Sequence, residues 1–394
     1  MAGGDKPYRV YRGGRVKGKV PLERRERVRS PQRNGYEPGQ PRPPRQRPRR
    51  KRSWTKRIAV TLLALIVLFA LWALLGFLSF RGGVKDANKR LPASVKATLA
   101  KDNGALLNNS TDILLLGTDH MNNDQRAADF HSDSIMLLRT DPGRHRLVYL
   151  SIPRDLRVPI PGYGDQKINA AMQIGGPALA VRTVSSFTRL PVNHVMIIDF
   201  SQFRQLVDSI GGIDVNVPER ILSNPFDCPY TAAKCSTWKG WRFAKGMQHM
   251  NGERAQIYSR IRENQLNPAD SDITRGERQQ QVLRAVIAKL TSFSTFLKAP
   301  FDAGNYVKPL TTDLSAWQFV QLGWVLKRAP ESRALHCRLG GTSDPSGTSD
   351  IIGTPENIGV IGMVTGASAP QPPPPGSQFL PGCYVGNEGL NARP

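Results

Sequence analysis

Three short strings place acidic side chains at the ends of apolar, strand-like runs. The strings are LLLGTD (114–119), SDS (132–134) and SIPRD (151–155). We expect Asp119, Asp133, Arg154 and Asp155 to gather at one rim of a sheet, because each comes where a strand-like run begins or ends. Carboxylates beside an arginine suit a divalent metal and a phosphate. These four residues are therefore the candidate catalytic group.

Asp119 and Asp133 are the candidate metal ligands. A hard cation such as Mg²⁺ takes one or two carboxylates and completes its shell with water and substrate phosphate oxygens. The alternative is that the two aspartates cap loops, which is a common role at strand ends. The spacing alone does not decide between these interpretations.

A second group of residues is basic. Arg260 and Arg262 lie in the apolar string AQIYSRIR (255–262), and a buried arginine needs an anionic partner. Lys167 begins the string KINAA. Guanidinium groups bind phosphate oxygens in a two-point fashion. The alternative is ordinary surface basicity in a chain with 55 Lys and Arg residues.

A long helix is predicted from Arg275 to about Leu297. Its apolar stripe runs through Val282, Val286 and Leu290. Extended backward, the stripe passes through Gln279 and Arg275, with Arg278 at its edge. Thr274 and Glu277 have the spacing of a capping box. Because a helix N-terminus attracts anions, we interpret the first turns as a phosphate site. Alternatively, the first turn overhangs the core and its arginines are solvated.

The sequence contains neither a G-x-S-x-G nucleophile motif nor a Walker A run. Ser134 and Ser151 have no convincing histidine partner, and His194 and His131 are isolated. Acidic and basic groups without a nucleophile favour direct phosphoryl or phosphodiester transfer, in which positioning and electrostatics supply most of the rate.

The run 58–80 has 23 residues without a charge, which is long enough to cross a bilayer as a helix. The flank 45–57 is far more basic than 81–85, so we expect the N-terminus in the cytoplasm and the rest outside it. Residues 1–57 carry 20 Lys and Arg against 4 Asp and Glu, while the whole chain has a net charge of +24. An ATP-dependent activity would be out of place beyond the membrane.

Strand-like runs alternate with helical stretches after residue 110, which indicates a layered α/β domain. The strands are expected at 112–117, 134–139, 147–152, 195–200 and 213–217, and the helices at 167–189, 201–210, 250–262 and 314–329. A hairpin string joins the second and third strands, so the sheet is expected to be mixed.

All four cysteines lie beyond the apolar run, where disulfides can persist. Cys228 and Cys235 are the expected pair because they are close neighbours in one loop. A zinc site is the alternative, although no paired C-x₂-C motif accompanies them. The pairing of Cys337 and Cys383 stays open.

The order of these motifs resembles the LytR–CpsA–Psr family of bacterial cell-wall assembly. The matching strings are DILLLGTD (112–119), SDSIMLL (132–138), SIPRD (151–155), KINAA (167–171), FSQFRQLVDSIGGIDVNVP (200–218), MNGERAQIYSRIR (250–262) and D-x-x-R-x-x-RQQ (272–280). The resemblance covers roughly residues 110–300. It implies an α/β/α sandwich with a central mixed sheet and a hydrophobic pocket for a polyprenyl lipid.

The resemblance also implies an activity. Family members transfer glycopolymers such as teichoic acid or capsule from a polyprenyl-pyrophosphate carrier to peptidoglycan, with Mg²⁺ as the usual ion. By motif, Asp119 and Asp133 take the metal positions, and Asp155 and Gln279 orient the surrounding groups. The pyrophosphate-binding positions are Arg154, Arg260, Arg262, Arg275, Arg278 and Gln279.

Five segments follow from these expectations. They are a disordered basic cytoplasmic tail (1–57), a transmembrane helix (58–80), a juxtamembrane linker and helix (81–110), a LytR–CpsA–Psr catalytic domain (111–340) and a Gly- and Pro-rich, linker-like extension (341–394). The tail composition suggests an actinobacterium.

His131 stands where the family often has arginine, which makes the site sensitive to pH. A polyprenyl-pyrophosphate hydrolase would use the same residues and differ only in the acceptor. A membrane regulator would bind nucleic acid through the basic tail without sequence preference, but no specific nucleic-acid partner is expected, because the tail has no folded reading element.

Overall fold

The computed structural model describes residues 54–118, 131–268, 272–374 and 380–386. Asp119 and nearly all of the predicted tail lie outside these residues. The chain divides into a unit of Met1–Ile58 and a unit of Ala59–Pro394, and the architecture below concerns the second unit.

Helix α1 (Trp54–Lys89) contains the predicted membrane span and continues beyond it. The apolar part of α1 is not buried by the rest of the protein, as suits one membrane-crossing helix. The last turns differ, because Gly83, Val84 and Ala87 are buried. A linker and helix were expected over 81–110, and the chain stays helical to Lys89, where it contacts the domain. The short helix α2 (Ala93–Lys96) follows.

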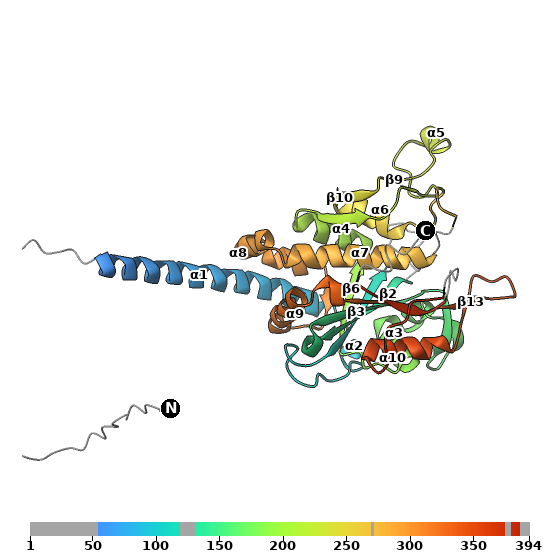
Figure 1. Ribbon diagram of the computed structural model, residues 1–394, viewed down its shortest axis with the longest axis horizontal. Helices are drawn as coiled ribbons and strands as arrows, with labels where there is room; N and C mark the ends of the chain where they lie inside the picture. Colours follow the sequence, from blue (N-terminus) through green and yellow to red (C-terminus); the bar gives the residue numbers. More distant parts are fainter. Residues whose placement is uncertain (1–53, 119–130, 269–271, 375–379, 387–394) are drawn as a thin grey trace, which may run out of the picture. The chain divides into compact units, whose positions relative to one another are not determined.

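A seven-stranded mixed sheet forms the centre of the domain (Figure 1). In spatial order its strands are β11 (Thr311–Thr312), β6 (His194–Asp199), β1 (Thr111–Thr118), β2 (Ser132–Asp141), β3 (Arg146–Ile152), β12 (Leu335–Arg338) and β15 (Gly382–Val385). The strands β1, β2 and β3 are antiparallel, whereas β1–β6 and β3–β12 are parallel. The expected mixed sheet is confirmed.

Helices cover both faces of this sheet, which makes the domain an α/β/α sandwich. Leu114 and Leu116 point to one face, where they share a core cluster with residues of α2, α3 (Ala170–Thr188) and α10 (Glu356–Thr365). Ile113 and Met136 point to the other face, toward α7 (Asp272–Leu290) and α9 (Ala316–Arg328). The alternation of side chains along the strands thus separates two cores.

Further elements pack on the outer side of α7 around a third core cluster. They are α4 (Phe200–Ser209), α6 (Gly252–Arg260), α8 (Phe293–Val307) and the antiparallel pair β7 (Ile213–Val217) and β10 (Gly246–Met250). A second, four-stranded sheet has the order β13 (Gly341–Ser343), β14 (Ile351–Gly353), β4 (Leu156–Ile160) and β5 (Gly164–Lys167). A separate pair is formed by β8 (Ile221–Leu222) and β9 (Arg242–Phe243), and the short helix α5 (Ala232–Cys235) lies between them in the sequence.

The long predicted helix is in fact two helices. α7 already begins at Asp272 and ends at Leu290. Thr274 therefore lies inside α7, where its hydroxyl accepts a hydrogen bond from Arg278 Nη2 (3.1 Å) instead of capping the helix. Ser292 begins α8 by accepting from the Thr295 amide (3.3 Å). The capping-box expectation was wrong because the helix starts earlier than its apolar stripe.

The described residues of the expected extension, 341–374 and 380–386, pack with the domain. They supply β13, β14 and α10, and β15 forms one edge of the central sheet. A disulfide between Cys337 and Cys383 joins β12 to β15. The expected disulfide Cys228–Cys235 is confirmed. Short strands among Gly, Ser and Pro residues gave too weak a periodic signal to be recognised in the sequence.

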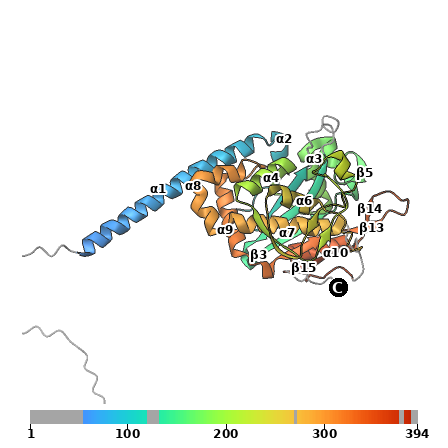
Figure 2. The ribbon, with the colours of Figure 1, turned by 90° about the horizontal axis from the view of Figure 1, so that it is seen from above.

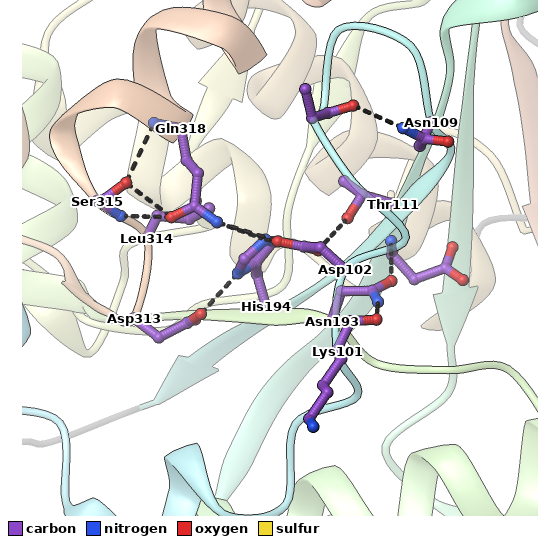
Figure 3. A network of polar contacts seen from close by, with 12 residues as sticks. Lys101, Asp102, Asn109, Thr111, Asn193, His194, Asp313, Leu314, Ser315 and Gln318 are labelled. Carbon is purple, nitrogen blue, oxygen red and sulfur yellow. Dashed lines mark hydrogen bonds and ion pairs between the residues drawn. The ribbon is translucent and has the colours of Figure 1, made fainter.

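A buried polar network ties the loop before β1 to β6 and α9 (Figure 3). The Nδ1 atom of His194 lies 2.6 Å from Asp313 Oδ2, and its Nε2 atom lies 3.2 Å from Asp102 Oδ2. Asp313 Oδ1 also accepts from the Val195 amide (2.8 Å), and Asp102 accepts from Gln318 Nε2 (3.0 Å). His194 therefore has a structural role.

We predict that Asp313→Ala destabilises the domain by about 3 kcal/mol, because it leaves the Nδ1 atom of the buried His194 ring and the buried Val195 amide without their partner. Thermal unfolding of the full chain in detergent should show a melting temperature lower by several degrees. Asp86→Ala removes an exposed ion pair with Lys89 (3.4 Å) and is the control, with an expected change below about 1 kcal/mol. Equal melting temperatures for the two variants would contradict this role.

Candidate functional site

A polar cavity of about 820 Å³ lies beside the ends of β2 and β3, between the start of α7 and the end of α6. Its lining residues are His131, Asp133, Arg154, Asp155, Gln166, Lys167, Asn169, Ala170, Phe200, Ser223, Asn224, Pro225, Phe226, Arg260, Arg262, Glu263, Arg275 and Gln279. Among the predicted site residues that the structure describes, all but Arg278 are in this lining. The expected gathering of strand ends and arginines is therefore present.

The cavity carries an excess of positive charge among its described lining residues. Five are lysine or arginine and three are aspartate or glutamate. Such a balance favours an anion with more than one negative charge, because each cation can donate to a different oxygen.

Arg154 stands between the two described aspartates of the candidate catalytic group. Its Nη1 donates to Asp133 Oδ1, and its Nε donates to Asp155 Oδ2 (3.3 Å). Lys167 Nζ donates to the other oxygen of Asp155 (3.0 Å). About a fifth of each of the Arg154, Asp133 and Asp155 side chains is exposed, so the group is fixed yet still reaches the cavity.

Lys167 is held in place by residues that were not recognised in the sequence. Its Nζ atom donates to Ser349 Oγ (2.6 Å) and lies 3.5 Å from Asp350 Oδ1. Asp350 also pairs with Arg157 (3.7 Å). Ser349 and Asp350 lie in the loop between β13 and β14. No motif marked them in the sequence, because this segment was expected to be a linker.

Arg260 leaves the end of α6 and contacts two aromatic rings. Its guanidinium carbon lies 4.8 Å from the Phe200 ring centre and 5.6 Å from that of Phe226, and its Nη1 donates to Asp227. Cation–π contacts of this kind hold the guanidinium at a defined position. Arg262 lines the cavity but is exposed, so the predicted apolar setting is wrong for this residue.

Helix α7 presents Arg275 and Gln279 to the cavity. Arg275 is buried, with 6% of its surface exposed, and Gln279 Oε1 accepts from Ser134 Oγ (2.9 Å). The alternative of a solvated first turn is thus excluded.

Arg278, also buried, donates through Nε (3.2 Å) and Nη2 (2.6 Å) to the Ile261 carbonyl. Arg278 thus supports the chain between Arg260 and Arg262 and is not among the lining residues of the polar cavity, and its phosphate contact stays a prediction.

Gln280 fixes α7 above the central sheet. Its Nε2 donates to Ser151 Oγ (2.8 Å) and to the Cys337 carbonyl (3.3 Å). Its Oε1 lies 2.9 Å from His336 Nδ1, and His336 Nε2 lies 2.8 Å from Glu331 Oε1. Burial lowers the pKa of His336, with the Glu331 hydrogen bond opposing it. These contacts anchor the polar half of α7.

An apolar cavity of about 390 Å³ continues between the sheet and α7. Leu115, Met136 and Met196 line it from the sheet, and Val282 and Val286 line it from the later turns of α7. The side chains of Phe200 and Gln279 line both cavities. The polar and apolar spaces therefore meet, and together they suit a molecule with an anionic head and a hydrocarbon tail.

A metal site is not evident among the described residues, which contain no group of three His, Cys, Asp or Glu side chains placed to hold an ion. Asp119, the second predicted ligand, lies outside the described residues. His131 lines the polar cavity and is half-buried.

The LytR_cpsA_psr family model matches residues 79–352. A polyisoprenyl-teichoic acid–peptidoglycan teichoic acid transferase, TagU of Bacillus mycoides, is 36% identical over 184 residues, which are 46% of this chain and 53% of that protein. TagV of Bacillus subtilis, with the same activity in its name, is 36% identical over 170 residues, 42% of this chain and 41% of that protein. The chain thus spans about half the length of these curated relatives.

Solved structures share the fold. TagT bound to LIIa-WTA is 27% identical with a TM-score of 0.53, over 69% of this chain and 95% of that chain. A crystal structure of Bacillus subtilis TagV is 26% identical with a TM-score of 0.51, over 64% of this chain and 94% of that chain.

Asp227 should compete with an anion for Arg260. We predict that Asp227→Asn tightens the binding of inorganic pyrophosphate by roughly threefold to tenfold, as expected for loss of a partly exposed ion pair. Isothermal titration calorimetry on the full chain in detergent measures the change.

Asp214→Asn is the matched control, because Asp214 pairs with His249 (2.8 Å) on an exposed surface. Its pyrophosphate affinity should equal that of the wild type. Unchanged or weaker binding by Asp227→Asn would show that Asp227 does not compete.

Proposed function

Because this chain belongs to the LytR_cpsA_psr family, we propose that it transfers a glycopolymer from a polyprenyl-pyrophosphate carrier to peptidoglycan, leaving a phosphodiester link. The observation that carries the proposal is the meeting of a cationic cavity and an apolar cavity at Phe200 and Gln279. The names of the TagU and TagV relatives support teichoic acid as the class of glycopolymer.

The two cavities would divide the carrier between them. The prenyl tail would lie between the sheet and α7, where burial of hydrocarbon contributes about 25 cal/mol per Å². The pyrophosphate would lie against Arg154, Arg260 and Arg275, with Lys167 and Arg262 at the edge. Arg278 enters this proposal only through Ile261, whose carbonyl it holds.

The proposed reaction is a direct displacement at phosphorus. A peptidoglycan hydroxyl oxygen attacks the sugar-linked phosphorus, the bond from this phosphorus to the bridging oxygen breaks, and polyprenyl phosphate leaves. The hydroxyl proton passes to a carboxylate of the cavity, for which Asp155 is the described candidate. The arginines stabilise the charge on the transferred and leaving phosphates, which is the main source of rate in such chemistry.

Magnesium forms part of the proposal, with Asp133 and Asp119 as its ligands. The oxygen donor of Asp133 suits Mg²⁺, and a magnesium site needs only one or two carboxylates beside phosphate oxygens. Asp133 Oδ1 already accepts from Arg154, so the arginine and the ion would share this carboxylate. The ion would neutralise part of the pyrophosphate charge.

We also propose that α1 is a single-pass anchor with the basic N-terminus in the cytoplasm and the domain outside. The apolar part of α1 and the basic flank 45–57 support this orientation. Both proposed substrates would then be met at the outer face of the membrane.

We predict that Asp133→Ala lowers transfer at least about a hundredfold, since it removes an oxygen ligand and the partner that orients Arg154. The assay follows a labelled lipid-linked glycan and peptidoglycan with the full chain in vesicles. Asp165→Ala is the control, because Asp165 is exposed on β5 outside the cavity lining, and its activity should match the wild type.

Full transfer by Asp133→Ala would remove Asp133 from the mechanism.

The assay also separates transfer from hydrolysis. Label bound to peptidoglycan supports the proposed ligase, whereas released glycan phosphate without bound label would identify a polyprenyl-pyrophosphate hydrolase. Absence of both products with intact carrier would favour the non-enzymatic regulator.

A further inference from the structure

Helices α8 and α9 expose large apolar side chains that the domain core does not use. On α8, Phe293 and Phe301 are 73% and 81% exposed, and on α9, Trp317 and Trp324 are 61% and 58% exposed. Spacings of eight and seven residues place each pair on one face of its helix. Apolar faces of this size mark a contact with a protein or a membrane.

Both helices lie on the side of the domain from which α1 leaves, as Figures 1 and 2 show. The Phe296 ring of α8 contacts the Trp72 ring of α1, with centres 4.7 Å apart. The Phe319 ring of α9 contacts Phe80 at 5.8 Å. Closer to the domain, α1 and α8 cross at Gly83, where a Cβ atom would lie only 2.3 Å from the Gly304 carbonyl oxygen.

These contacts define a depth in the bilayer. The uncharged run 58–80 spans about 34 Å as a helix, close to the thickness of a hydrocarbon core of about 30 Å. Trp72 lies eight residues before Phe80, or roughly 12 Å inside the end of that run. The segment 58–72 alone would span only about 22 Å, which is too short to cross. Phe296, which touches Trp72, must therefore lie below the membrane surface.

The residues around the exposed faces fit a bilayer interface. Arg328 lies over the Trp324 ring at 5.9 Å, and Lys327 is its exposed neighbour. Lys298 is exposed on α8, between the phenylalanines. Tryptophan beside lysine or arginine is typical of membrane interfaces, where basic side chains reach the headgroups.

We propose that the exposed faces of α8 and α9 form a membrane seat, which is immersed in the bilayer leaflet nearest the domain. The seat is defined by Phe293, Phe296, Leu297, Phe301, Trp317 and Trp324. The inference rests on α1 crossing a bilayer, as in the proposed function, and is independent of the reaction. The apolar cavity is bounded by Phe80, Tyr306 and Phe319 of the same three helices. Its hydrocarbon-lined end therefore lies at the bilayer, and a prenyl tail reaches it without crossing water.

Spin labels test the seat on the full chain in phosphatidylglycerol–phosphatidylcholine vesicles, without any substrate. The four native cysteines are paired in disulfides, so Phe293→Cys and Phe301→Cys each provide one free thiol for a nitroxide. Tyr163→Cys is the matched control, an exposed aromatic position between β4 and β5, and Leu68→Cys reports lipid around α1. The measure of immersion is the accessibility of the nitroxide to oxygen divided by its accessibility to a water-soluble nickel complex.

The ratio at 293 and 301 should be several-fold higher than at 163 and should approach that at 68. A ratio at either seat position equal to that at 163 overturns the proposal. A low ratio at 68 as well would instead show that α1 does not cross the bilayer, and so contradicts the proposed anchor together with the seat. If the labels are immersed but the unlabelled wild type shows no transfer in the separate glycan-transfer assay, the proposed function alone is contradicted.

Discussion

The position of α7 above the central sheet is the constraint on which the site depends. Its first turns carry polar side chains and its later turns carry apolar ones on the same face, so one continuous space changes character along one helix. Gln280 fixes the polar half to Ser151 and to the Cys337 carbonyl, and Gln279 bonds to Ser134 where the two cavities meet. A shift of α7 onto the sheet would close the apolar cavity.

The same constraint relates the chemistry to the membrane. A cationic cavity alone would accept many phosphates, and an apolar cavity alone would accept many lipids, whereas the joined pair selects a molecule with both parts. The apolar end is bounded by α1, α8 and α9, and the polar end by strand ends and the loop around Phe226. Under the proposed function, the apolar cavity would face the bilayer, and the reacting phosphates would lie in the polar cavity, which is open to water.

Much of this arrangement could be predicted from the sequence. Apolar runs located β1, β2, β3, β6 and β7, and motif order placed Asp133, Arg154 and Arg260 at one cavity. The direction of the Arg278 side chain could not be predicted from the sequence. Side chains at successive helix positions point about 100° apart around the axis, and only the contact with the Ile261 carbonyl shows which way Arg278 turns. Lys167's partner Asp350 was missed because a tertiary contact 183 positions away leaves no local pattern. The apolar cavity depends on residues from many elements, which no single motif contains.

The central claim is that one ligand occupies both cavities. A structure of the full chain with a polyprenyl pyrophosphate bound tests this claim most directly. We predict that the pyrophosphate contacts Arg154, Arg260 and Arg275 and that the prenyl chain passes Phe200 and Gln279 to lie along Val282 and Val286. A pyrophosphate bound elsewhere, or a prenyl chain on the outer surface of the domain with the apolar cavity filled by side chains, would contradict it.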